Sequence, residues 1–148
     1  MLEGLIEYFK KLSKIDENQI LHDILEDKTL QAQIIDLNQH QLYDEGIQAD
    51  GTETGQYALK TIQYKQAYGD SRGIPGNTSH ITGNDTGQTY DSMKVQNMPD
   101  SFLITAEDRN DFFAREPEGL GLTNESIDEI IPEIKDEFIK KVRKAIER

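Results

Sequence analysis

One tripeptide in the chain belongs to a known type of catalytic site. Asp85-Thr86-Gly87 is the tripeptide of aspartic proteases, in which two copies bring two carboxylates together to share one proton. In those enzymes two apolar residues precede the tripeptide, whereas Gly83-Asn84 precede it here. We therefore interpret Asp85, Thr86 and Gly87 as structural capping elements of a short helix that follows. A hydrolase that uses Asp85 is the third of our functional interpretations.

A second segment has the glycine spacing of a calcium-binding loop. Aligning Gly51 with the invariant sixth position places Gly46 at the first ligand position. Tyr57 then occupies the twelfth position, where such a loop needs a bidentate Glu. The first and the last ligand are both missing, so we interpret the segment as a turn that uses the left-handed conformations of glycine.

Histidine offers little further chemistry. The chain has three His and no Cys, and His22, His40 and His80 have no partner at metal-site spacing. His80 lies between Ser79 and Asp85, but three such residues so close in sequence rarely form a catalytic triad. We therefore expect no enzyme activity, no metal site and no cofactor.

The charge is large, negative and unevenly distributed. The 148 residues include 16 Lys+Arg and 28 Asp+Glu, a net charge of −12. Residues 135–148 hold six basic and three acidic residues, a net of +3, which leaves 10 basic and 25 acidic residues, a net of −15, for the rest. A duplex-binding domain normally presents a basic face. We therefore expect the body to repel DNA and the C-terminal segment to contact an acidic neighbour, including another copy of the chain.

Apolar spacing of three and four predicts helices at both ends of the chain. We expect one over residues 2–13, a second after an N-cap at Asp16, and a continuation capped by Thr29 that ends near Gly46. Near the C-terminus, Ser126 and Glu129 fit a capping box. The long helix that follows is expected to start or bend at Pro132.

The middle of the chain predicts shorter elements. A helix is expected from about Ala58, then a Gly-rich loop over 69–85. Two strand candidates, Lys94–Asn97 and Phe102–Ala106, flank a hairpin turn at 98–101. The fold class is therefore α+β, with long helices packed on a small antiparallel sheet and a long Gly-rich loop. We divide the chain into an N-terminal helical extension, 1–28, and an α+β domain, 29–148.

Tyrosine is concentrated around these turns. Five of the six tyrosines lie between residues 43 and 90. Tyrosine is enriched at protein interfaces, because it buries a large area at a low cost in side-chain entropy. Local packing beneath the long loop explains the same pattern, and the sequence leaves both interpretations open.

Two longer segments resemble small phage and prophage proteins of Bacteroidota. The first is Leu42–Gly51, followed by Gly55–Tyr57, Thr61-Ile62 and Lys65; the second, Asp85–Val95, matches their D-T-G-x-x-Y-x-S segment. That segment is similar to the T-G-x-L-x-x-S-I-x-V element of the phage virion-morphogenesis, or tail-completion and neck, families. Gly119–Thr123, before the C-terminal helix, also fits this resemblance. The resemblance covers roughly residues 40–130; Tyr90 stands where the broader family has Leu, and residues 2–26 have no counterpart.

The resemblance implies a long helix on a small sheet, a flexible loop and assembly in a ring between the capsid portal and the tail. We accordingly expect a structural virion protein of the head–tail junction, located in the virion, that forms part of a neck ring or completes the tail. Its expected partners are copies of itself and portal, connector or tail-tube proteins, with DNA passing without specific binding and no membrane. The expected contact residues are Tyr64, Tyr68, Arg72, Ile74, Pro75, His80, Lys140, Lys141, Arg143 and Lys144.

The same acidic body supports an alternative function. An acidic cytoplasmic binding module, such as a DNA-mimic inhibitor of a basic partner, would use the −15 charge directly. Binding to a basic DNA-handling enzyme would favour this alternative, and presence in purified virions would exclude it.

Overall fold

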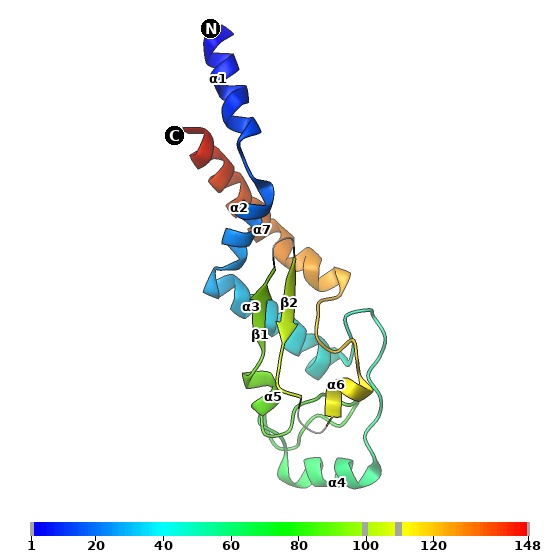
Figure 1. Ribbon diagram of the computed structural model, residues 1–148. Coiled ribbons are helices and arrows are strands. Elements are labelled where there is room, and N and C mark those ends of the chain that lie inside the picture. Colours follow the sequence, from blue (N-terminus) through cyan, green and yellow to red (C-terminus); the bar gives the residue numbers. More distant parts are fainter. Residues whose placement is uncertain (1, 99–100, 109–110, 148) are drawn as a thin grey trace.

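The computed structural model describes residues 2–98, 101–108 and 111–147 (Figure 1). Most of the elements are helices, and a single pair of strands is present in these ranges. In chain order the elements are α1 (Leu2–Ser13), α2 (Glu17–Leu25), α3 (Lys28–His40), the π-helix η1 (Gln41–Glu45), α4 (Leu59–Tyr68), α5 (Gln88–Asp91), β1 (Lys94–Asn97), β2 (Phe102–Thr105), α6 (Phe112–Arg115) and α7 (Asn124–Glu147).

Aspartate caps set the starts of the second and third helices. The Asp16 carboxylate accepts the N–H of Gln19 at 3.2 Å, which confirms the predicted cap of α2. The predicted cap at Thr29 is wrong, because the Asp27 carboxylate accepts the N–H of Leu30 at 3.0 Å. Asp27 has an extended backbone and a side-chain acceptor, so α3 begins two residues earlier than expected.

The helical run ends at Gly46, as the sequence predicted. Gly46 caps η1 in the left-handed conformation, with φ of 66°. A Cβ atom at this position would lie 2.5 Å from Cγ of His80. Glycine is therefore required both by the backbone angle and by the histidine ring packed against it.

The hairpin confirms the α+β fold class. β1 and β2 pair antiparallel, with Lys94 opposite Thr105 and Val95 opposite Ile104. The N–H of Met98 donates to the carbonyl of Ser101 at 2.9 Å, while Pro99 and Asp100 of the predicted turn lie outside the described residues. Ile104 is 7% exposed and joins the core, so one face of this small sheet is covered.

The C-terminal helix starts one turn before the predicted capping box. The Thr123 hydroxyl accepts the N–H of Ser126 at 3.2 Å, and the Thr123 carbonyl accepts the N–H of Ile127 at 3.0 Å. Thr123 is therefore the N-terminal cap, and the predicted Ser126–Glu129 box is wrong. Pro132 lies inside α7, so the predicted start at this proline is wrong as well. The start of α4 is confirmed, with Ala58 as its extended N-cap.

Two apolar clusters form the core. One joins α2, α3, β2 and α7 through Ile24, Leu25, Leu30, Ile34, Ile104 and Ile130. The other lies beneath the loops and comprises Leu42, Tyr90, Met93 and Phe112. The molecule is elongated: α1 projects at one end beside the C-terminus of α7, and α4 lies at the other end (Figure 1).

Candidate functional site

The predicted contact surface on α4 is aromatic and exposed. Tyr64 and Tyr68 stand one turn apart, with ring centroids separated by 5.0 Å, and they are 56% and 70% exposed. The loop after α4 returns to it and presents Ile74, which is 73% exposed, together with the exposed Pro75. Large apolar side chains gathered on a surface in this way are typical of a protein interaction site.

Asp70 holds the first half of that loop in place. Its carboxylate accepts the Tyr43 hydroxyl at 2.9 Å and the backbone N–H groups of Arg72 and Asn77 at 2.8 Å and 3.3 Å. Burial, and then the hydrogen bond to Asp70, raise the pKa of Tyr43 above its usual value. The loop is therefore organised by hydrogen bonds within its own chain.

Arg72 is exposed but contacts its own chain. Its guanidinium lies 4.7 Å from the ring centroid of Tyr43 and 5.3 Å from that of Tyr90. It also donates to Oε1 of Gln39 at 3.0 Å. These contacts fix the orientation of Arg72 on α3 and the tyrosines. The residue as a whole is exposed, and its role in subunit contacts stays a prediction.

His80 does not belong to the contact surface. It is 9% exposed, and its Nε2 lies 2.9 Å from the carbonyl oxygens of both Leu42 and Tyr43. The prediction that His80 contacts a neighbouring subunit is therefore wrong. A buried ring that hydrogen-bonds backbone carbonyls of the π-helix cannot also reach another molecule, and its role is structural.

A buried polar network lies beneath α4. Lys65 is 4% exposed; its Nζ donates to the carbonyl of Asn84 at 2.7 Å and lies 5.0 Å from the ring centroid of Tyr57. The Tyr57 hydroxyl lies 2.9 Å from the Thr82 hydroxyl, and the Tyr90 hydroxyl donates to the Thr82 carbonyl. Burial raises the pKa of Tyr90 far above its usual value. This network fixes residues 82–84, which have no regular secondary structure.

The structure thus separates the five clustered tyrosines into two groups. Tyr43, Tyr57 and Tyr90 pack locally and hydrogen-bond within the chain, whereas Tyr64 and Tyr68 are exposed on α4. Both interpretations left open by the sequence therefore describe part of the cluster, local packing for the first group and an available surface for the second.

A pocket of about 430 Å³ lies between α4 and the start of α5. Asp85 is the sole carboxylate among the described residues that line it, with Lys65 and Arg115 as the cationic residues. The chemistry of an aspartic protease needs two carboxylates close together. A single copy of the described chain therefore lacks the geometry for a shared proton at Asp85.

The capping role predicted for this tripeptide is confirmed at one of its three residues. Gly87 is the N-cap of α5, with φ of 92° in the left-handed region. The prediction that Asp85 and Thr86 cap the helix is wrong: both are exposed and precede the cap residue. A Cβ at Gly87 would lie 3.1 Å from the Ser71 side chain, so glycine also lets the loop approach the helix closely.

The predicted basic contacts lie far from the aromatic surface. Lys140, Lys141, Arg143 and Lys144 occupy the last turns of α7, at the end of the molecule opposite α4 (Figure 1). Lys140 forms an exposed ion pair with Glu137 at 3.3 Å. The candidate contact residues therefore form two separate surfaces rather than one.

Two features escaped the sequence reasoning. A groove of about 520 Å³ between α2, α3 and α7 is lined by several carboxylates and by Lys140 and Lys141. Asn38, which is fully buried, donates to the Gly119 carbonyl and accepts the Gly121 N–H, both at 2.9 Å. Asn38 sits four residues after Ile34 on the apolar stripe of α3, and a polar residue at such a position is a detectable signal of a buried hydrogen bond.

The described residues contain neither a metal-binding group of side chains nor a membrane-spanning helix. No group of three or more His, Cys, Asp or Glu there could hold a metal ion. None of the helices in these ranges is long and apolar enough to cross a membrane. Comparisons with protein-family models, curated proteins and solved structures found no match to the chain.

Proposed function

We propose that the chain is a structural virion protein of the phage head–tail junction, which forms part of a neck ring or completes the tail. The observation that carries the proposal is the apolar surface left exposed at both ends of the elongated molecule. On α1, Leu5 and Phe9 are 50% and 59% exposed; beyond α4, Tyr68 and Ile74 are 70% and 73% exposed. A subunit that completes its burial on assembly leaves surfaces of this kind.

The resemblance described above supports the same proposal. Its D-T-G-x-x-Y-x-S segment forms the loop and helix beside the α4 surface, from Asp85 to Ser92. The long helix α7 and the small hairpin agree with the architecture that the resemblance implies. In this proposal the α4 surface and the basic end of α7 contact neighbouring copies or a portal, connector or tail-tube protein, and no catalysis is involved.

The charge is consistent with a channel through which DNA moves without binding. Residues 124–137 of α7 carry six exposed carboxylates: Glu125, Asp128, Glu129, Glu133, Asp136 and Glu137. Carboxylates facing a lumen offer phosphate groups no cation, so DNA slides past them. A ring whose pore is lined by lysine and arginine would contradict this part of the proposal.

Protein mass spectrometry of purified phage particles tests the virion role. We expect the chain in gradient-purified particles at a fixed ratio to the portal protein. A phage that lacks the gene is expected to yield unjoined heads and tails, or tails that are not completed, under the electron microscope. A chain found in the host cytosol and missing from purified particles would overturn the proposal.

The row of carboxylates on α7 also favours a second function, an acidic module that mimics DNA. Exposed carboxylates along a helix can imitate phosphate groups and occupy the cleft of a basic DNA-handling enzyme. Such binding would weaken steeply with salt. Co-purification with such an enzyme, together with absence from virions, would select this function over the first.

A further inference from the structure

The apolar face of α1 is only partly covered within its own chain. Leu5, Ile6 and Phe9 are 50%, 46% and 59% exposed on a helix of 12 residues. Isolated helices shorter than about 12–15 residues are marginal in water, and an amphipathic helix gains stability by packing its apolar face. α1 projects from the body beside the end of α7 (Figure 1). The exposed part of this face is therefore available to the surface of another molecule.

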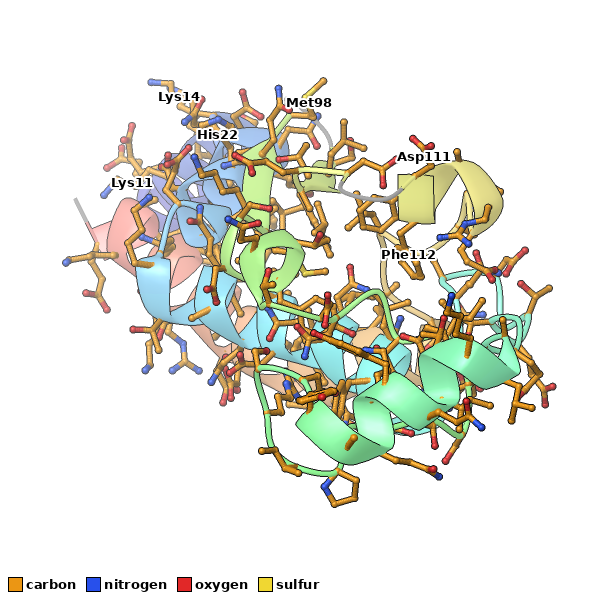
Figure 2. All side chains as sticks on the ribbon, turned by 90° about the horizontal axis from the view of Figure 1, so that it is seen from below. Lys11, Lys14, His22, Met98, Asp111 and Phe112 are labelled. Carbon is orange, nitrogen blue, oxygen red and sulfur yellow. The ribbon has the colours of Figure 1, made fainter. Side chains whose placement is uncertain are left out.

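The projecting end is basic, unlike the rest of the chain. Residues 2–14 and 140–147 together hold seven basic and three acidic residues, a net of +4, so the remaining residues have a net of −16. Lys11, in the last turn of α1, and Lys14, just after it, are labelled in Figure 2 and stand where the helix joins the body. Two such ends would repel each other. A partner surface that covers α1 must therefore be acidic.

The groove between α2, α3 and α7 has the matching chemistry. Its volume is about 520 Å³, and the buried side chains of Ile24 and Leu30 contribute apolar surface to it. Five carboxylates line it, Asp23, Asp27, Glu133, Asp136 and Glu137, together with two cations, Lys140 and Lys141, so its lining keeps a net negative charge. α1 presents an apolar stripe, with Glu3 and Glu7 in its first half and Lys10 and Lys11 in its last turn, and Lys14 follows it directly, so residues 2–14 have three basic and two acidic residues.

We propose that α1 of one copy docks in the acidic groove of a second copy. The complementarity of charge and of apolar surface is present within one chain, which is why the occupant is another copy. Helix and groove are different surfaces, so the contact is heterologous, and its repetition produces a ring or an open filament. The inference rests on the proposed function for its ring form, while the contact itself is measurable on the purified protein.

Removing the apolar stripe tests the helix side. The variant Leu5→Ser/Ile6→Ser/Phe9→Ser should shift the full-length protein from oligomers to monomers in sedimentation-velocity and light-scattering measurements, with at least about a tenfold rise in dissociation constant. Leu103→Ser is the matched control, because Leu103 is 51% exposed on β2 and lines neither surface. Circular dichroism verifies that both variants fold.

Charge reversal with mixing tests the pairing of the two surfaces. A helix-reversed variant, Lys10→Glu/Lys11→Glu/Lys14→Glu, and a groove-reversed variant, Asp136→Lys/Glu137→Lys, should each be monomeric. Mixed in equal amounts they should assemble with strict alternation in native mass spectrometry, because the acidic helix of one fits the basic groove of the other. Pairing of α1 with α1 predicts instead that the groove-reversed variant assembles by itself.

Several results would overturn the inference. A wild type that stays monomeric up to high micromolar concentration would do so, as would oligomers unaffected by the serine variant. Binding of α1 to vesicles of phosphatidylserine and phosphatidylcholine, abolished by the serine variant while self-association persists, would assign the helix to a membrane surface instead. These outcomes leave the virion role standing, because that role depends on particle composition. Absence from particles would remove the virion role and leave a measured α1 contact intact.

Discussion

Different interactions stabilise the two ends of the molecule. At the α4 end, irregular backbone is fixed by buried polar groups: Gln48, Lys65, His80, Thr82 and Asn84 are each at most 9% exposed. At the α1 end, regular helices pack through aliphatic side chains such as Ile24 and Leu30, and α1 itself leaves its apolar face open. Both ends leave apolar side chains exposed, but the backbone of the α4 end is fixed by polar groups of its own chain, whereas α1 projects as a helix with a half-exposed apolar face.

In this chain of modest apolar content, hydrogen bonds and apolar contacts have different roles. A directed hydrogen bond can hold a loop in one conformation, because an unpaired buried carbonyl or N–H costs about 1–3 kcal/mol. Apolar contact is not directional, so an aliphatic helix face accepts several partners of similar shape. The α4 end therefore presents a preformed surface, whereas the exposed apolar face of α1 can pack on a neighbouring copy.

The largest effect is expected in the apolar cluster that joins the two ends. Ile34 is fully buried in α3, and Ile34→Ala should lower the free energy of unfolding by about 2–5 kcal/mol, through lost transfer energy and a cavity. Urea unfolding followed by circular dichroism measures it. Leu59→Ala, at a side chain that is 70% exposed, is the control and should change stability by less than about 0.5 kcal/mol. Equal losses in the two variants would contradict the assignment of the core.

Asn38→Ala should lower the free energy of unfolding by about 2–4 kcal/mol, because the buried Gly119 carbonyl and the partly buried Gly121 N–H would each lose a partner. Hydrogen exchange should rise at Gly121, whose N–H the Asn38 side chain accepts, while the hairpin stays protected. The matched control is Asn18→Ala, on an exposed asparagine of α2. Unfolding that is uniform across the molecule, with no preferential exchange near residue 121, would show that the polar network does not act locally.

Tyr90→Phe removes the hydroxyl that donates to the buried Thr82 carbonyl. This change should lower the free energy of unfolding by about 1–2 kcal/mol at pH 8. Burial raises the pKa of Tyr90, so the folded state keeps its proton at a pH where the unfolded state, with a pKa near 10, has lost it. The contribution of this group is therefore complete below pH 10 and falls above it, by up to about 1.4 kcal/mol per pH unit.

The difference between wild type and Tyr90→Phe should accordingly shrink as the pH rises from 9 to 11. Urea unfolding at several pH values measures this trend. Tyr64→Phe, on an exposed tyrosine of α4, removes the same hydroxyl without removing a buried hydrogen bond and serves as the control. A difference for Tyr90→Phe that is constant over this range would show that the buried hydroxyl is not linked to stability.

Residues with periodic spacing were predicted well, because periodicity reports burial directly. The bounds of α1, the Asp16 cap, the end of the helical run at Gly46 and both strands follow from local patterns. Caps failed where two candidates lay close together. Asp27 took the place of Thr29, and Thr123 that of Ser126, because the choice depends on the direction in which the chain arrives at the helix.

The candidate site was predicted only in part, since its polar contacts join distant segments. His80 was assigned to the surface from its place in a Gly-rich loop, yet its ring reaches carbonyls 37 and 38 residues earlier in the chain. In the sequence, Lys65 was noted only as one of the residues that resemble phage proteins, whereas in the structure its buried ammonium donates to the Asn84 carbonyl. The acidic groove combines side chains from α2, α3 and α7, so its existence depends on helix packing that sequence spacing does not describe.

The smallest effect on the monomer, and the sharpest contrast between the two ends, is expected at α1. Phe9→Ser should change the stability of dilute protein by less than about 0.5 kcal/mol, because the ring is already 59% exposed. Assembly stabilises the folded state by mass action, so the wild-type melting temperature should rise with protein concentration and that of Phe9→Ser should not. Calorimetry over a hundredfold concentration range measures the trend, with Leu103→Ser as control. Parallel concentration dependence in all three proteins would place the subunit contact at the α4 end, where the aromatic surface is preformed.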